Sequence, residues 1–283
     1  MTPRLIADLT TLLCLLPLTV IAFRPVTSGR TWLFWLALCL AAAGTAARAG
    51  IQILPGWPIG LGAALWMTIA NCLILYAGLC LTTASAWRLA RLLLPYLLIL
   101  ASFAAAAPVS PLISSPLAIP QVWPGIGPGI GPGIWVNIHI GLSVLTYALV
   151  TLAAVAALAG MLQEHAIKAK QVNSLTRALP PVSESEALQV RLLVLAEIIL
   201  GVGLLTGITA LHYARGAYLR LDHKSLLSLC AFIVIGILLF AHVRSGIRGR
   251  SATRLVLTAY LLLTLAYIGV KFVREVLLTG AVL

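Results

Sequence analysis

Eight long apolar runs, separated by polar or glycine- and proline-rich connections, make up most of this chain. A helix needs about 20 apolar residues to cross the hydrocarbon core of a bilayer, because each residue adds about 1.5 Å. Each run is close to that length, so we predict eight membrane-spanning helices. The predicted spans are residues 5–23, 31–47, 60–84, 89–107, 135–162, 188–213, 225–243 and 254–278.

Two of the connections bear on how the chain is organised. The connection 108–134 runs into the near-repeat WPGIGPGIGPGIW, residues 123–135, whose glycines and prolines exclude a helix. Trp123 and Trp135 at its ends are typical of anchors at a membrane surface. Residues 163–187 mix charged residues with prolines and are predicted to form a solvated loop. The predicted division is an N-terminal four-helix part, residues 1–134, and a C-terminal four-helix part, residues 135–283.

Composition supports the same class of protein. Hydrophobic residues make up 61% of the chain, charged residues only 9%, and the mean hydropathy is +1.07. A soluble domain of this size fills its core with far less apolar surface. The chain is therefore predicted to be an all-α, polytopic membrane protein in contact with the lipid bilayer. We assign the formal net charge of +12 to cytoplasmic loops rather than to nucleic-acid binding.

The basic residues predict how the spans are oriented. Every second connection, beginning with the first, is rich in Lys and Arg, which favours the cytoplasmic side. These residues are Arg24, Arg30, Arg88, Arg91, Lys168, Lys170, Arg177, Arg244, Arg248, Arg250 and Arg254. Both termini are thus predicted to lie on the outer, periplasmic side. The sixth connection breaks the bias with Arg215, Arg220 and Lys224, which favour either an anionic partner or contact with lipid headgroups.

Neither the cysteines nor any catalytic grouping indicates a reactive site. All five cysteines fall inside apolar runs and none forms a CxxC pair. We therefore predict buried structural thiols rather than a redox or zinc motif. The chain has no nucleophile–base pair and no metal triad with workable spacing. A protein without enzymatic activity is expected.

Histidines at the ends of three spans are the main chemical signal. His139, Ser143 and Tyr147 are spaced i, i+4 and i+8, so they share one face of their helix. His212 ends the next span at a similar predicted depth, and two such imidazoles can hold the iron of a flat macrocycle. His242 ends the following span on the opposite side, about 20–30 Å away, and cannot share that metal. For each histidine the alternative is a hydrogen-bonded side chain at the membrane interface.

Other polar residues each leave two interpretations open. Glu197 lies in the middle of its span without an evident partner and is expected to be protonated. A single acid of this kind is a weak signal for proton or cation transport. Asp222 and Lys224 flank His223 in the sixth connection. They fit either a solvated turn that caps the next helix or, with the neighbouring arginines, a surface that holds anionic groups such as propionates.

Several sparse residues recur in an order known from one protein family. They are Thr206-Gly207, Gly216, Asp222-x-Lys224, His242 and Gly246-x-x-Gly249-Arg250, preceded by His139-x-x-x-Ser143-x-x-x-Tyr147-Ala148. This pattern resembles the cytochrome c assembly family, which includes the haem-handling proteins CcsA and CcmC. Because no tryptophan follows Trp135, the tryptophan-rich loop of those two proteins is missing. The chain is most similar to the HemX-like and YpjD-like branch of inner-membrane proteins.

The resemblance implies a haem-binding protein of the inner membrane, active in cytochrome c assembly or haem homeostasis, with protein partners in the membrane or periplasm. It implies His139 as the outer ligand of haem iron, His242 as the inner one and His212 as a candidate second outer ligand. The residues implied to support the haem site are Ser143, Tyr147, Asp222 and Lys224. Two other classes stay open: a regulatory or scaffold subunit without a cofactor, and a transporter of a small solute.

Overall fold

The computed structural model describes residues 3–24, 31–53, 60–107, 132–171, 173–215, 223–247, 249–273 and 276. Within these ranges the chain is helical and contains no strand. Eight of the described helical segments are long and apolar enough to cross a membrane. The prediction of an all-α protein with eight spans is therefore confirmed.

The first four spans form the N-terminal part of the bundle. Their helices are α1 (Pro3–Ala22), α2 (Trp32–Ile53), α3 (Leu61–Thr82) and α4 (Ala90–Ala106), and a short 3₁₀ turn, η2 (Ala86–Leu89), leads from α3 into α4. Pro95 lies inside α4, as the sequence predicts. Membrane helices tolerate such a proline because neighbouring groups satisfy the freed carbonyl.

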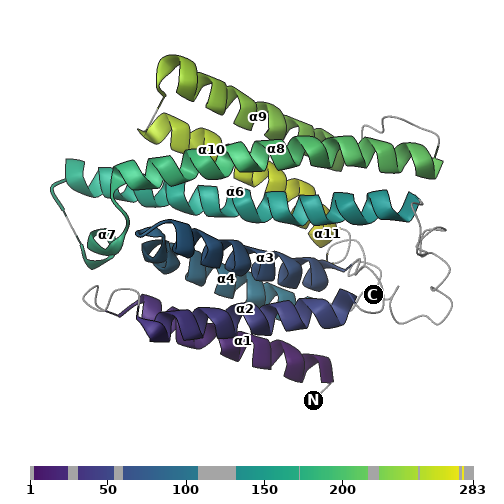
Figure 1. Ribbon diagram of the computed structural model, residues 1–283, viewed down its shortest axis with the longest axis horizontal. Coiled ribbons are helices and arrows are strands. Elements are labelled where there is room, and N and C mark those ends of the chain that lie inside the picture. The colour runs from purple at the N-terminus through teal and green to yellow at the C-terminus, as the bar shows by residue number, and fades with distance from the viewer. Residues whose placement is uncertain are drawn as a thin grey trace.

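The last four spans follow residues 108–131, which lie outside the described residues. They are α6 (Pro132–Lys168), α8 (Val182–Arg215), α9 (His223–Ser245) and α10 (Gly249–Thr264), the last continued by a π-helical turn, η4 (Leu265–Gly269), and by α11 (Val270–Phe272). A short helix, α7 (Ser174–Ala178), lies between α6 and α8. The antiparallel pair of α6 and α8 runs along the middle of the molecule, with α1–α4 on one side and α9 and α10 on the other (Figure 1).

Polar contacts show which helix ends lie together. At one end, the Arg91 guanidinium donates to the carbonyl oxygens of Ala22 and Arg24, at 2.8 and 2.7 Å, and to that of Ser174 at 3.4 Å. At the other end, Arg4 donates to the carbonyl oxygen of Ala107 at 2.9 Å. The ends of α1 and α6 and the starts of α4 and α7 are therefore grouped, as an alternating up-and-down path requires. We call the end that carries α7 the α7 end.

Two sequence-based expectations for the connections are wrong. The segment that ends at residue 134 was expected to exclude a helix, but α6 begins at Pro132, where the first turn of a helix tolerates a proline. Residues 163–187 were expected to be a solvated loop, but α6 continues to Lys168 and α8 already begins at Val182. Between them Leu179 is only 1% exposed. Asn173 caps α7 by accepting from the Thr176 backbone N–H at 2.8 Å. A capping box of this kind satisfies helix-terminal donors within the segment itself.

A buried ion pair joins α1 to α2. Arg48 Nε lies 2.8 Å from a carboxylate oxygen of Asp8, and the two residues are 7% and 2% exposed. Arg4 approaches the other oxygen of Asp8 at 3.5 Å. Charges inside membrane helices are costly unless they are paired. The pair therefore fixes which faces of α1 and α2 meet.

Candidate functional site

His139 lies on the face of α6 that packs against α8. Its Nδ1 is 2.8 Å from the carbonyl oxygen of Gly203. A carbonyl oxygen can only accept, so Nδ1 carries the proton and donates it. The second ring nitrogen, Nε2, is then unprotonated and keeps its lone pair. An imidazole prepared in this way is the usual form of a histidine that binds a metal.

The imidazole of His139 is seated against Gly207. A Cβ added to Gly207 would lie 2.9 Å from His139 Cε1 and 3.1 Å from Nδ1, closer than atoms of this kind approach. Only glycine lets the ring lie this close to the backbone of α8. Thr206 also donates to the Gly203 carbonyl oxygen, at 2.9 Å. The segment 203–207 thus fixes both the position and the protonated nitrogen of His139.

A small cavity lies one to two turns along α6 from His139. Ser143, Thr146 and Tyr147 of α6 line it, opposite Lys224 and Ser228 of α9, and its volume is about 40 Å³. That volume suits about one water molecule, whose share of liquid is roughly 30 Å³. Ser143 itself donates to the His139 carbonyl oxygen at 2.7 Å. The structure therefore brings Ser143, Tyr147 and Lys224 together around one small space, whose lining also includes Leu200, Leu263 and Ala266.

His212 lies on a different face of α8 from the glycines that seat His139. It follows Gly207 by five residues, which is about 140° around the helix and about 7.5 Å along it. It shares its side with Gly201, where an added Cβ would meet the ring of Phe232 at 3.3 Å. His212 is thus placed on the α9 side of α8 and beyond His139. Its pairing with His139 stays a prediction, and Asp222 lies outside the described residues.

His242 occupies the last turn of α9, at the α7 end. Its Nδ1 is 3.0 Å from the carbonyl oxygen of Ile247, a few residues further along the chain. Gly246 makes this turn with a φ of 63° and donates its N–H to the His242 carbonyl oxygen at 3.1 Å. The same argument puts the proton on Nδ1 and leaves Nε2 as the free nitrogen. His139 and His242 lie at opposite ends of the bundle, and each has its proton on Nδ1 and an unprotonated Nε2.

Glu197 lies at the contact of α8 with α9. Its Oε1 would be 3.1 Å from a Cβ added to Gly236. Its Oε2 is buried and has no hydrogen-bond partner among the residues that the structure describes. No group of three or more metal-binding side chains occurs in those residues.

A cluster of hydroxyl groups that the sequence did not reveal lies behind Tyr147. The Tyr147 hydroxyl is 3.3 Å from those of Tyr96 and Tyr260 and 3.2 Å from that of Thr264, and Tyr260 donates to Tyr96 at 2.5 Å. The ring of Tyr267 lies 5.6 Å from that of Tyr147. The spacing of residues 260, 264 and 267 on one helix face was the available signal. The cluster ties α4, α6 and α10 together beside the small cavity.

The family of the chain follows from comparison with known proteins. The model of the family described as "Cytochrome C assembly protein" matches residues 61–278, well over half of the chain. The chain belongs to the cytochrome c assembly protein family. The match covers every element that carries His139, His212 and His242. It begins at α3, so α1 and α2 lie outside the part that the family model describes.

Two relatives extend this result. The chain is 51% identical over 282 residues to a 28.8 kDa protein in the nifR3-like 5' region of Azospirillum brasilense, covering 98% of this chain and all of that protein. It is 30% identical over 140 residues to the inner membrane protein YpjD of Escherichia coli, covering about half of each chain. No solved structure gives a significant match. With its eight spans, this member of the cytochrome c assembly family is a multi-pass inner-membrane protein.

Proposed function

We propose that this member of the cytochrome c assembly family binds haem through His139 and His242, as part of cytochrome c assembly or haem homeostasis. The observation that supports it is shared by the two histidines. Each donates Nδ1–H to a backbone carbonyl, at 2.8 Å for His139 and 3.0 Å for His242. Each therefore presents an unprotonated Nε2, the nitrogen that a haem iron requires.

The two histidines belong to two separate haem sites in this proposal. They lie at opposite ends of the bundle, and a span of about 30 Å of hydrocarbon separates such ends. His139 is the outer ligand and His242 the inner one. His212, on the α9 side of α8, is the candidate second ligand at the outer site. Haem supplies the iron and the redox chemistry, while the chain supplies the axial nitrogens and their fixed orientation.

Lys224 is the group that suits a carboxylate at the outer site. It lies at the start of α9, lines the small cavity, and its positive charge acts on the His139 imidazole. A lysine beside the iron ligand can neutralise a propionate at the edge of the ring. The cavity of about 40 Å³ is too small for the ring itself.

Visible spectra of the purified protein test the proposal. We expect a Soret band in the wild type, reduced by about half in His139→Ala and in His242→Ala and absent in the double variant. His165→Ala and His223→Ala are matched controls, since both side chains are exposed, and they should keep the full band. A wild type that lacks the band after reconstitution with haem, or a double variant that keeps it, would contradict the proposal.

A further inference from the structure

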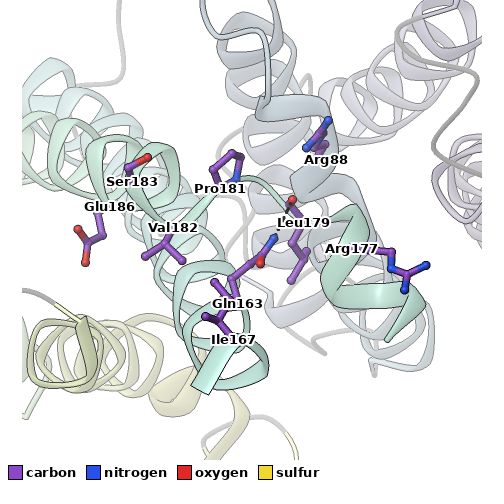
Figure 2. Close-up of a pocket in the computed structure, with 9 residues that line it drawn as sticks. All are labelled: Arg88, Gln163, Ile167, Arg177, Leu179, Pro181, Val182, Ser183 and Glu186. Carbon is purple, nitrogen blue, oxygen red and sulfur yellow. Dashed lines mark hydrogen bonds between the residues drawn. The ribbon is translucent and has the colours of Figure 1, made fainter. Parts of the chain in front are cut away.

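A second, larger cavity opens at the α7 end of the bundle. Its volume is about 610 Å³, and its wall is formed by η2, the end of α6, the end of α7 and the first turns of α8 (Figure 2). Along α6 it lies about 40 Å from His139. It shares no lining residue with the small cavity beside Tyr147. The haem proposal makes no use of it.

Hydrogen bonds hold the wall of this cavity in place. Gln163 of α6 donates from Nε2 to the carbonyl oxygens of Thr176 and Leu179, at 2.9 and 3.2 Å. Leu179 and Pro180, which follow α7, are both buried. The capping box on Asn173 fixes the start of α7. The cavity is therefore a feature of the packed fold and does not depend on a loose loop.

Two arginines without a countercharge lie on one side of the cavity. Among the described residues, no carboxylate forms an ion pair with Arg88 or Arg177, and Arg88 Nε is buried without a hydrogen-bond partner there. Glu186 is the acidic residue in the wall, but Figure 2 shows it on the opposite side. Its Oε1 accepts the Gly249 N–H at 3.1 Å. The side with the arginines is thus suited to an anion.

Away from the arginines, the wall mixes apolar and polar residues: Ile167, Leu179, Pro181 and Val182 lie beside Gln163, Ser183 and Glu186. Ile167 is 61% exposed at the end of α6, and Val182 lies beside it at the start of α8. The first turn of a long helix also presents unpaired N–H donors and a favourable dipole to an anion. A ligand with a negative head and an apolar body matches the two arginines, the start of α8 and the apolar side chains. Basic pockets between membrane helices are a known setting for anionic lipid headgroups.

We propose that this cavity binds the phosphodiester headgroup of an anionic phospholipid, with Arg88 and Arg177 at the phosphate and Ile167 and Val182 along the glycerol and acyl region. The lipid source follows from the position of the cavity. In the predicted orientation the cavity lies at the cytoplasmic ends of the spans, beside apolar side chains that a free phosphate would not use. Bound lipid would join η2 to α7, and so the N-terminal helices to the α6–α8 pair.

Native mass spectrometry of the delipidated full-length protein tests this site. With phosphatidylglycerol and phosphatidylcholine of equal chain length in competition, we expect the wild type to retain phosphatidylglycerol. Arg177→Gln should lower that retention about fivefold, the loss typical of one basic residue at a lipid surface, and adding Arg88→Gln should lower it further. Arg244→Gln is the control, since this exposed arginine lies at the same end outside the cavity.

Each outcome decides the matter. Equal retention of the two lipids by the wild type, or unchanged retention in the double variant, overturns the proposal. Displacement of the lipid by excess inorganic phosphate would identify a site for free phosphate and overturn the lipid source. If the double variant fails to fold, Arg177→Gln alone and phosphate competition on the wild type still decide, because Arg177 is exposed. None of these results depends on haem.

Discussion

At the scale of single residues, the proposed haem sites depend on which ring nitrogen of each histidine carries the proton. His139 and His242 were identifiable from the sequence, because imidazoles at the ends of apolar spans stand out. Their hydrogen-bond acceptors were not, since the Gly203 and Ile247 oxygens are backbone atoms that any residue type provides. Gly207 stood out as part of the Thr206-Gly207 pair in the family pattern. That it seats the His139 ring required the packing of α6 on α8.

Gly207→Ala tests this seat directly. The new methyl group would lie 2.9 Å from His139 Cε1, so the ring must move and its bond to Gly203 must lengthen. Overpacking of this kind costs about 1–3 kcal/mol in stability. We expect the haem content, measured by the Soret absorbance per protein, to fall by about as much as we expect for His139→Ala.

Gly203→Ala is the matched control for that substitution. It keeps the carbonyl oxygen, and its added Cβ would lie 3.7 Å from Leu142 Cβ, an ordinary contact. Haem content should stay near that of the wild type. Equal haem content in the two alanine variants would show that the ring does not depend on Gly207.

At the scale of helices, the number and type of the elements were predictable and their ends were not. Hydrophobic length identifies a span because the bilayer sets it. It does not show that α6 and α8 continue past the apolar run, or that Leu179 is buried between them. Asp8 also escaped notice, since it is a single charge inside a span. Arg48 was assigned to the connection after the span 31–47, which is wrong because α2 continues to Ile53. Their pairing becomes visible only when α1 packs on α2.

Arg48→Leu should destabilise the packing of α1 on α2. It leaves the Asp8 carboxylate buried without its 2.8 Å partner, and breaking a buried pair from one side costs about 3–5 kcal/mol. We expect a lower midpoint of thermal unfolding in detergent. Adding Asp8→Leu should recover most of the loss, because no buried charge is then left unpaired; Arg4 also loses Asp8 but is partly exposed and keeps its bond to the Ala107 carbonyl oxygen.

Arg24→Leu provides the comparison for the ion pair. This exposed arginine makes no ion pair among the described residues, so its replacement should leave the midpoint nearly unchanged. If Arg48→Leu and Arg24→Leu unfold at the same temperature, the Asp8–Arg48 pair does not stabilise the bundle.

At the scale of the whole molecule, the grouping of helix ends agrees with the path expected from the sequence, and the side of the membrane stays a prediction. The basic connections predict that the α7 end lies in the cytoplasm. In a variant without native cysteines, Ser174→Cys should react with an impermeant maleimide only after the membrane is permeabilised. His223→Cys, at the start of α9, should react in intact spheroplasts. The reverse pattern of labelling would show that the α7 end lies on the outer side of the membrane.

The length of α6 has a consequence for how His139 can be approached. Its 37 residues extend about 55 Å, whereas the hydrocarbon layer is about 30 Å thick. His139 lies seven residues from the start of the helix, about 10 Å below its tip. About 25 Å of the helix must therefore lie outside the hydrocarbon layer, and we expect the end that carries His139 to reach the membrane–water interface. A soluble partner protein would then reach the imidazole without entering the bilayer.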